Sequence, residues 1–283
     1  MRIANVNGRL KLLVAGGSVD VATASAGRFG FDPQAAYEHF DELRRWAATI
    51  SEPSEEFGQE MAGPPVPAPR QVFAVGLNYL DHAAESGFAV PEVPLVFTKY
   101  VSSFSGAVSQ VELPVGSVDW EVEVVAVIGK TARSVPTEQA WDHVAGLTVG
   151  QDLSERDLQR SGPAPQFGLA KSFPGFSPMG PAVVSLDEIE EPADLMLGCD
   201  INGEVMQKGR TSDMIFPIPE LISYLSRVVT LYPGDIIYTG TPPGVGMGRT
   251  PPRYLHSGDH LHSWVGGLGE LRQRFVDAPM ALV

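Results

Sequence analysis

The chain has 283 residues, of which 43% are hydrophobic and 19% charged, the composition of an ordinary folded protein. Its 34 acidic residues outnumber the 20 basic ones and give a formal charge of −14, which argues against binding nucleic acid over a broad surface. The single cysteine, Cys199, excludes an intrachain disulfide and is interpreted as a small core residue in a protein of a reducing compartment.

Neither a signal peptide nor a membrane span is indicated. The first five residues are not followed by the long apolar region of a signal peptide. The longest apolar runs, such as 122–129, are too short to cross a bilayer. We therefore expect a cytoplasmic protein without a membrane or nucleic-acid partner.

The first 68 residues differ in pattern from the rest. Residues 9–14 and 18–22 predict two short antiparallel strands, and the apolar spacing within 33–50 predicts an amphipathic helix. The proline-rich segment 63–69 predicts a stiff linker. We therefore expect a small N-terminal α/β domain at 1–68 and a larger domain at 69–283.

Beyond the linker the sequence is rich in short strand patterns. Helices are predicted only near Asn78 and at 219–230. Many strands with few helices indicate an α+β fold, mostly β, in the form of a mixed and mostly antiparallel sandwich or roll. The predicted strands are 72–75, 95–98, 121–128, 146–151, 182–185, 196–201 and 235–239.

Two carboxylates stand at the start of the most apolar of these strands. Glu121 and Glu123 share one face, with side chains about 6–7 Å apart along the strand. Like charges on a buried face repel, and a divalent cation between them would relieve the repulsion. A solvated strand end, or ion pairs within the protein, would also satisfy both groups.

Asp152 follows the strand predicted at 146–151 and could supply a third ligand. Three carboxylates with completing waters suit Mg²⁺ or Mn²⁺, and Ca²⁺ is also compatible. The alternative is that Asp152 caps the helix-like segment after it.

Further polar residues could act on a substrate beside such a metal. His82 and Glu85 lie three apart, so on a helix the carboxylate could orient the imidazole as a base, unless they form only a surface ion pair. Arg156, Gln159 and Lys171 could stabilise an oxyanion or an enolate, although solvated side chains would give the same pattern.

The glycine-rich segment 239–246 lacks the Gly-Lys-Ser/Thr of a phosphate-binding loop. Its backbone amides and the Thr241 hydroxyl could hold a substrate carboxylate, or the segment could be an ordinary loop. A zinc site built from His256, His260 and His262 is disfavoured, because nothing in the sequence makes the three imidazoles converge.

In order and spacing these segments resemble the fumarylacetoacetate hydrolase family over about 72–276. The segments that carry the resemblance are Val75-Gly76-Leu77-Asn78-Tyr79 with His82 and Glu85, Phe97-Thr98-Lys99, Glu121-Val122-Glu123, Gln151-Asp152, Arg156-Asp157-Leu158-Gln159, Leu169-Ala170-Lys171-Ser172-Phe173, Asn202-Gly203-Glu204, Gly234-Asp235-Ile236-Ile237-Tyr238-Thr239-Gly240-Thr241-Pro242 and Gly266-Gly267-Leu268-Gly269.

The resemblance implies a mixed β-sandwich roll, a homodimer and an Mg²⁺ or Mn²⁺ site. By it, the metal ligands are Glu121, Glu123 and Asp152; His82 and Glu85 form a water-activating dyad on a mobile lid; Arg156, Gln159 and Lys171 stabilise an oxyanion; and Thr241, Gly240 and Lys99 contact substrate. Two departures concern the pocket. Leu77 replaces an arginine of some small members, and the segment 247–253 is longer than usual.

The implied reaction is metal-dependent hydrolysis of a C–C bond in a β-diketo acid, such as an acylpyruvate, through an enolate. Decarboxylation of oxaloacetate, or isomerisation or hydration of a related keto acid, is the alternative for the same site. A ligand-binding homologue without catalysis is the remaining hypothesis.

Overall fold

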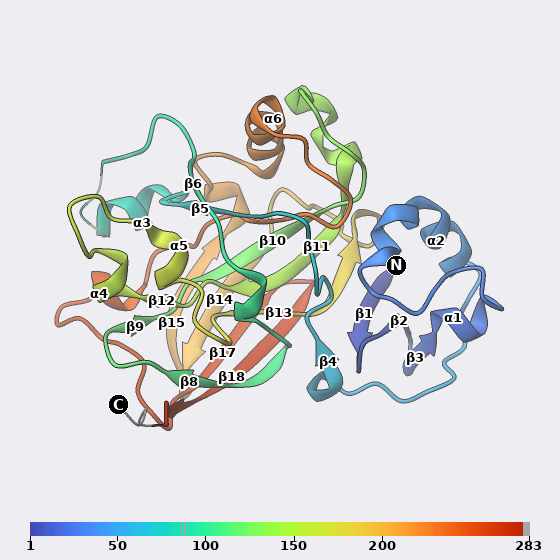
Figure 1. The fold of residues 1–283 in the computed structure, drawn as a ribbon, viewed down its shortest axis with the longest axis horizontal. Coiled ribbons are helices and arrows are strands. Elements are labelled where there is room, and N and C mark those ends of the chain that lie inside the picture. Colours follow the sequence, from blue (N-terminus) through green and yellow to red (C-terminus); the bar gives the residue numbers. More distant parts are fainter. Residues whose placement is uncertain (86, 88, 280–283) are drawn as a thin grey trace.

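The computed structural model describes residues 1–85, 87 and 89–279 (Figure 1). Its largest element is an 11-stranded sheet with the order β3-β2-β1-β13-β11-β10-β16-β5-β6, which β4 and β7 extend beside β1 and β13. The strands are β1 (Arg2–Val6), β2 (Arg9–Val14), β3 (Gly17–Asp20), β4 (Ala62–Gly63), β5 (Val72–Gly76), β6 (Leu95–Phe97), β7 (Phe104–Ser105), β10 (Val122–Ile128), β11 (Val144–Gln151), β13 (Ser177–Ser185) and β16 (Ile236–Tyr238).

A second sheet has five strands in the order β15-β14-β17-β18-β8. These are β8 (Val108–Leu113), β14 (Met196–Ile201), β15 (Glu204–Arg210), β17 (His260–Val265) and β18 (Gly269–Asp277), and a two-stranded ribbon joins β9 (Val118–Asp119) to β12 (Ser154–Glu155). Most pairs are antiparallel, but β16–β5, β18–β8 and β13–β7 are parallel. The predicted α+β, mostly β, mixed sandwich roll is therefore confirmed.

The helices are short. They are α1 (Val21–Ala24), α2 (Phe40–Ala47), α3 (Leu80–Glu85), α4 (Arg156–Gln159), α5 (Phe167–Ala170) and α6 (Ile218–Val228). The helix predicted at 33–50 begins as a 3₁₀ turn (Ala35–His39) and continues as α2. None of the helices described is long and apolar enough to cross a membrane.

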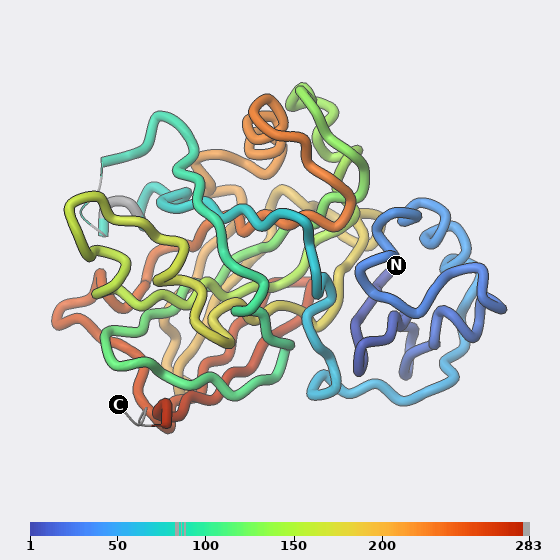
Figure 2. Tube along the Cα trace, in the orientation of Figure 1, coloured from blue at the N-terminus to red at the C-terminus, as the bar shows by residue number. Residues whose placement is uncertain are grey.

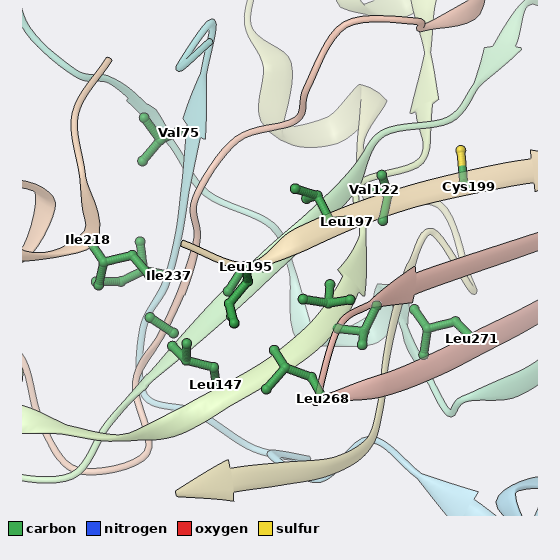
Figure 3. Close-up of a cluster of buried hydrophobic side chains, with 14 of the residues drawn as sticks. Val75, Val122, Leu147, Leu195, Leu197, Cys199, Ile218, Ile237, Leu268 and Leu271 are labelled. Atoms are coloured by element: carbon green, nitrogen blue, oxygen red, sulfur yellow. The ribbon is translucent and has the colours of Figure 1, made fainter. Parts of the chain in front are cut away.

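Strand β10 is buried on both faces, which explains its continuous apolar run. Val122, Val124, Ala126 and Ile128 belong to the core between the two sheets, where Figure 3 places Val122 near Leu197 of β14. Val125 and Val127 face the opposite way, into a second core. Glu121 and Glu123 lie on the same side of the strand as Val125 and Val127, at the end where the apolar packing stops.

The N-terminal segment forms much of the second core, through residues such as Tyr37 and Leu43. It lies at one end of the molecule (Figure 2), and β1 joins it to the large sheet by pairing with β13 at Ile3 and Val183. The sequence pattern missed β1. The division at residue 68 stays a prediction about independent folding.

Two expectations for the first 69 residues need correction. The strand predicted at 18–22 ends at Asp20, because its carboxylate accepts a hydrogen bond from the Thr23 amide (2.9 Å) and begins α1. The linker at 63–69 is packed against the protein: Val66 is fully buried, and the Tyr37 hydroxyl donates to the carbonyl of Pro65.

Candidate active site

The three predicted metal ligands converge. Glu121 precedes β10 and Asp152 follows β11, and these antiparallel strands place Glu123 opposite Gly150. The Asp152 amide also donates to the Glu121 carbonyl (2.9 Å), which ties the two chain segments together. One carboxylate oxygen from each of Glu121, Glu123 and Asp152 lies within 4.8 Å of the others, and all three side chains are buried. The geometry therefore supplies a three-carboxylate cluster.

Buried cations neutralise two of these carboxylates. Lys171 Nζ lies 2.7 Å from both Glu121 Oε2 and Asp152 Oδ2. Arg156 Nη2 lies 2.7 Å from Glu121 Oε1, and Lys99 forms an ion pair with Asp152 from the other side. The lysines and the arginine are themselves nearly inaccessible to solvent, so these pairs are only weakly screened.

Glu123 differs from its two neighbours. Among the residues that the structure describes it forms no ion pair, and its partner is the neutral amide of Gly240, which donates to Oε2 at 2.8 Å. Burial and the charges of Asp152 and Glu121 raise the pKa of Glu123 well above its usual value. Burial also acts on Glu121, but Lys171 and Arg156 outweigh it and lower the pKa of that carboxyl.

This donor set fits a divalent cation. All three ligand groups are carboxylates, the oxygen donors that Mg²⁺ and Mn²⁺ prefer. One of them, Glu123, has no positive partner among the described residues, and a divalent ion would compensate its charge.

The predicted dyad forms on α3. His82 Nδ1 and Glu85 Oε1 lie 2.9 Å apart. A carboxylate can only accept, so the proton is assigned to Nδ1 and Nε2 is left as the basic nitrogen. Glu85 also accepts from the amides of Gly244 (2.9 and 3.0 Å) and Val245 (3.4 Å). The predicted lid continues to residues 86 and 88, which lie outside the described residues.

A cavity of about 50 Å³ is lined by His82 of the dyad and by Glu121 of the carboxylate cluster. Val75, Leu77, Phe167 and Met247 form apolar parts of its wall. His82, Glu121, Arg156, Gln159, Lys171 and Thr241 contribute the polar groups, so most of the predicted site residues meet at one place.

Leu77, one of the two departures from the family pattern, lies on the wall of this cavity. Its backbone is left-handed (φ 55°), an unusual conformation for a residue with a side chain. The residue stands on the cavity wall, where it adds an apolar surface.

Most of the predicted oxyanion donors already have partners inside the protein. Lys171 donates to Glu121, Asp152 and Ser154. Arg156 donates to Asp119 through Nε and to Gln159 Oε1 through Nη1 (both 2.9 Å). The Nε2 amide of Gln159 is left without a partner in the described part of the chain, so it is the predicted donor best able to hold a substrate oxygen.

The residues predicted to contact substrate also have hydrogen-bond partners inside the protein. Lys99 lies behind Asp152 and donates also to the carbonyls of Lys171 and Phe176. The Gly240 amide holds Glu123. The Thr241 hydroxyl donates to the Val122 carbonyl (2.8 Å) and accepts from Gln207 (2.8 Å), although Thr241 lines the cavity. Lys99 and Gly240 therefore contact Asp152 and Glu123, two of the predicted metal ligands, and their contact with substrate stays a prediction.

The glycine-rich loop does bind carboxylates through its amides, but they belong to the protein. Gly240 holds Glu123, Gly244 and Val245 hold Glu85, and Gly246 and Met247 hold Asp119. The sequence interpretation passed over Asp119. Its signal was present, because Asp119, Glu121 and Glu123 continue a single alternation of acidic residues.

The histidines outside the site do not form a metal cluster in the described residues. His262 lies between Asp200 and Glu270, at 2.8 Å from each carboxylate, on the second sheet. His256 and His260 are exposed. Cys199 is buried in the core between the sheets, as interpreted (Figure 3).

Comparison with known proteins gives one family. The family model described as fumarylacetoacetate (FAA) hydrolase, C-terminal, matches residues 71–276. Human oxaloacetate tautomerase FAHD2A, named as mitochondrial, is 44% identical over 214 residues, which cover 75% of this chain and 68% of that protein.

Solved structures agree. A crystal structure from Mycobacterium smegmatis has 58% identity and a TM-score of 0.95, covering 99% of this chain and 100% of the other. Maleylpyruvate hydrolase from Sphingobium sp. SYK-6, solved with manganese (II) ion and pyruvate, has 28% identity and a TM-score of 0.78, and covers 99% and 100% of the two chains.

Proposed function

This chain belongs to the fumarylacetoacetate hydrolase family, and we propose that it is a divalent-metal-dependent enzyme that enolises a small 2-oxo acid. The observation that supports this most directly is the buried carboxylate cluster, in which Glu123 has no cationic partner among the described residues, beside a cavity lined by His82 of the dyad. Glu121, Glu123 and Asp152 would hold Mg²⁺ or Mn²⁺. Such an ion supplies Lewis acidity, which stabilises negative charge on a carbonyl oxygen.

The dyad supplies the base. Glu85 fixes the imidazole of His82 through Nδ1, so Nε2 is the atom that can take a proton. In the conversion of keto to enol, Nε2 accepts a proton from the carbon next to the carbonyl. The carbonyl oxygen gains a proton and becomes the enol hydroxyl. The amide of Gln159 donates to the oxygen on which charge develops.

Two reactions can use this arrangement, and we favour tautomerisation of a short diacid such as oxaloacetate. Tautomerisation removes a proton from carbon and adds one to oxygen, which needs only His82 and one donor, whereas the tetrahedral intermediate of hydrolysis needs an oxyanion hole, and the side chains of Arg156 and Lys171 are engaged elsewhere. The relative named oxaloacetate tautomerase supports this choice.

Hydrolysis of an acylpyruvate is the second candidate. In it, Nε2 of His82 takes a proton from water, the resulting hydroxide attacks the distal carbonyl, and the C–C bond breaks to leave an enolate. The dyad geometry suits this step equally well, and maleylpyruvate hydrolase with its pyruvate complex is a structural neighbour.

A substrate panel separates these candidates. Oxaloacetate enol–keto conversion, oxaloacetate decarboxylation and acetylpyruvate cleavage are each measured with Mn²⁺ and with EDTA. We expect metal-dependent tautomerisation to be the fastest of the three and to be lost in His82→Asn. Faster acetylpyruvate cleavage would support the hydrolase, and no rate above the uncatalysed one on any substrate would indicate a ligand-binding homologue.

Assembly and location are also proposals. A homodimer is tested by light scattering, and a cytoplasmic location by cell fractionation. Because the human relative is named as mitochondrial, a mitochondrial location is the alternative that fractionation would reveal.

A further inference from the structure

We propose that Asp119 is a positioning residue that fixes two polar side chains of the cavity, the base His82 and the donor Gln159. The proposal rests on the proposed function for the roles of these two residues. Asp119 lies outside the carboxylate cluster and belongs to β9, next to the ion pair between Arg156 and Glu121.

Asp119 is fully buried and both of its oxygens are saturated by donors. Its Oδ1 accepts from the amides of Trp120 (2.8 Å) and Gly246 (2.7 Å). Its Oδ2 accepts from Arg156 Nε (2.9 Å) and the Met247 amide (2.9 Å), and lies 2.9 Å from Arg156 Nη2. One carboxylate thus joins the glycine-rich loop to an arginine beside the proposed metal ligands.

The first arm runs from Asp119 to His82. By binding two successive amides, Asp119 fixes the loop at 246–247, and the amides just before them bind Glu85. Glu85 in turn holds His82 Nδ1. Because α3 is only six residues long, this contact with the loop is a major constraint on where the imidazole stands.

The backbone of the loop is shaped for these contacts. Gly244 has a φ of +108°, a conformation that residues with side chains rarely adopt. A Cβ at Gly246 would stand 1.9 Å from the Arg253 carbonyl and 2.8 Å from Asp119 Oδ1. Glycine at these positions lets the amides approach the two carboxylates.

The second arm runs from Asp119 to Gln159. Asp119 binds one edge of the Arg156 guanidinium, and Nη1 on that group donates to Gln159 Oε1. This bond directs the carbonyl oxygen of the Gln159 side chain toward Arg156 and leaves its Nε2 free to donate. Without Asp119, Glu121 would be the remaining anionic partner of Arg156 and would draw it toward the metal ligands.

Asp119→Asn is a sharp test because asparagine keeps the shape but offers one oxygen. Each carboxylate oxygen accepts from at least two N–H groups, so either orientation of the amide places its NH₂ against donors. Losing a partner that orients a ligand or catalytic group typically reduces activity roughly 10- to 100-fold.

Hydrogen exchange of the peptide spanning 78–85 gives a readout independent of activity. We expect Asp119→Asn to accelerate exchange there, to lower kcat for enolisation roughly 10- to 100-fold, and to preserve the increase in Tm that Mn²⁺ causes. Asp235→Asn is the matched control, since Asp235 is also fully buried and accepts two backbone amides, from Gln71 and Tyr232, away from the site. Its 78–85 exchange should match the wild type.

Wild-type exchange at 78–85 in Asp119→Asn would overturn the proposal, as would equal acceleration in Asp235→Asn, because the effect would then be general loosening. An inactive wild type would instead refute the proposed function, and the exchange comparison would still decide whether Asp119 fixes α3.

Discussion

Replacing Glu123 with Gln should stabilise the metal-free protein while destroying the proposed metal site. Glu123 is buried beside two other carboxylates, and within the described part of the chain its hydrogen-bond partner is the Gly240 amide. Gln keeps an oxygen for that amide and removes the charge. Stability and function are therefore expected to conflict at this position.

The size of the effect follows from the spacing of the cluster. A like charge 4.8 Å away costs about 3.5 kcal/mol at an effective dielectric constant near 20. Lys171 and Lys99 nearby cancel most of the repulsion from Glu121 and Asp152. We expect a net gain of about 1–2 kcal/mol, which raises Tm by roughly 2–6 °C in a chain of this size.

Thermal unfolding in EDTA measures the gain, and its pH dependence has a defined sign. Because the pKa of Glu123 is raised in the folded protein, its contribution to stability is full below the unfolded pKa and is lost as pH rises through the folded pKa. The difference between Glu123→Gln and wild type should therefore grow toward alkaline pH and vanish in acid. Saturating Mn²⁺ at 100 times its Kd should add about 2.7 kcal/mol to the wild type alone.

Glu121→Gln is the matched control, only two residues away. The pKa of Glu121 is lowered by Lys171 and Arg156 despite its burial, so its contribution is present above the unfolded pKa and is lost on acidification. That variant should be less stable than wild type at neutral pH, because two buried cations lose a partner. The same sign of change in both variants, or an Mn²⁺-induced rise in Tm that survives Glu123→Gln, would refute the reasoning.

Three further predictions concern single residues. His82→Asn should lower kcat roughly 100-fold or more yet keep the Mn²⁺-induced rise in Tm, measured side by side with steady-state kinetics. Gly246→Ala should destabilise the protein by about 1–3 kcal/mol in urea unfolding, since its Cβ would meet the Arg253 carbonyl. The hydrogen bond from Arg9 lowers the pKa of Asp20, so the stability that Asp20 contributes is present above its unfolded pKa and is lost as pH falls toward its folded pKa. Asp20→Asn should therefore cost about 1 kcal/mol at pH 7 and less in acid, measured by urea unfolding at pH 7 and at an acidic pH.

The convergence of the three carboxylates could be predicted because its signals are local. Alternation along one strand puts Glu121 and Glu123 on one face, and an acid after the next apolar run is placed at the same sheet edge by antiparallel pairing. The dyad was predictable for the same reason, since a spacing of three on a helix brings His82 to Glu85.

The assignment of donors could not be predicted, because it depends on contacts between distant segments. Lys171 reaches Glu121 and Asp152 across 50 and 19 residues, and nothing local distinguishes such a lysine from one that faces substrate. The same holds for the pairing of β1 with β13, which lies far along the chain, although its other partner β2 follows it directly. The glycine-rich segment predicted backbone amides that bind a carboxylate. Only the fold identifies the bound carboxylates as Glu85, Asp119 and Glu123.

Charge balance connects the cluster to the kind of substrate proposed. When Asp119 is counted with the cluster, the four carboxylates of Asp119, Glu121, Glu123 and Asp152 face three buried cations, Lys99, Arg156 and Lys171, so this larger group is one positive charge short. A divalent ion would overshoot this deficit by one, and the carboxylate of a bound 2-oxo acid would restore neutrality in a site where charge is weakly screened. A protein with an overall charge of −14 can thus attract an anionic substrate, because the attraction is local and exists only when the metal is in place.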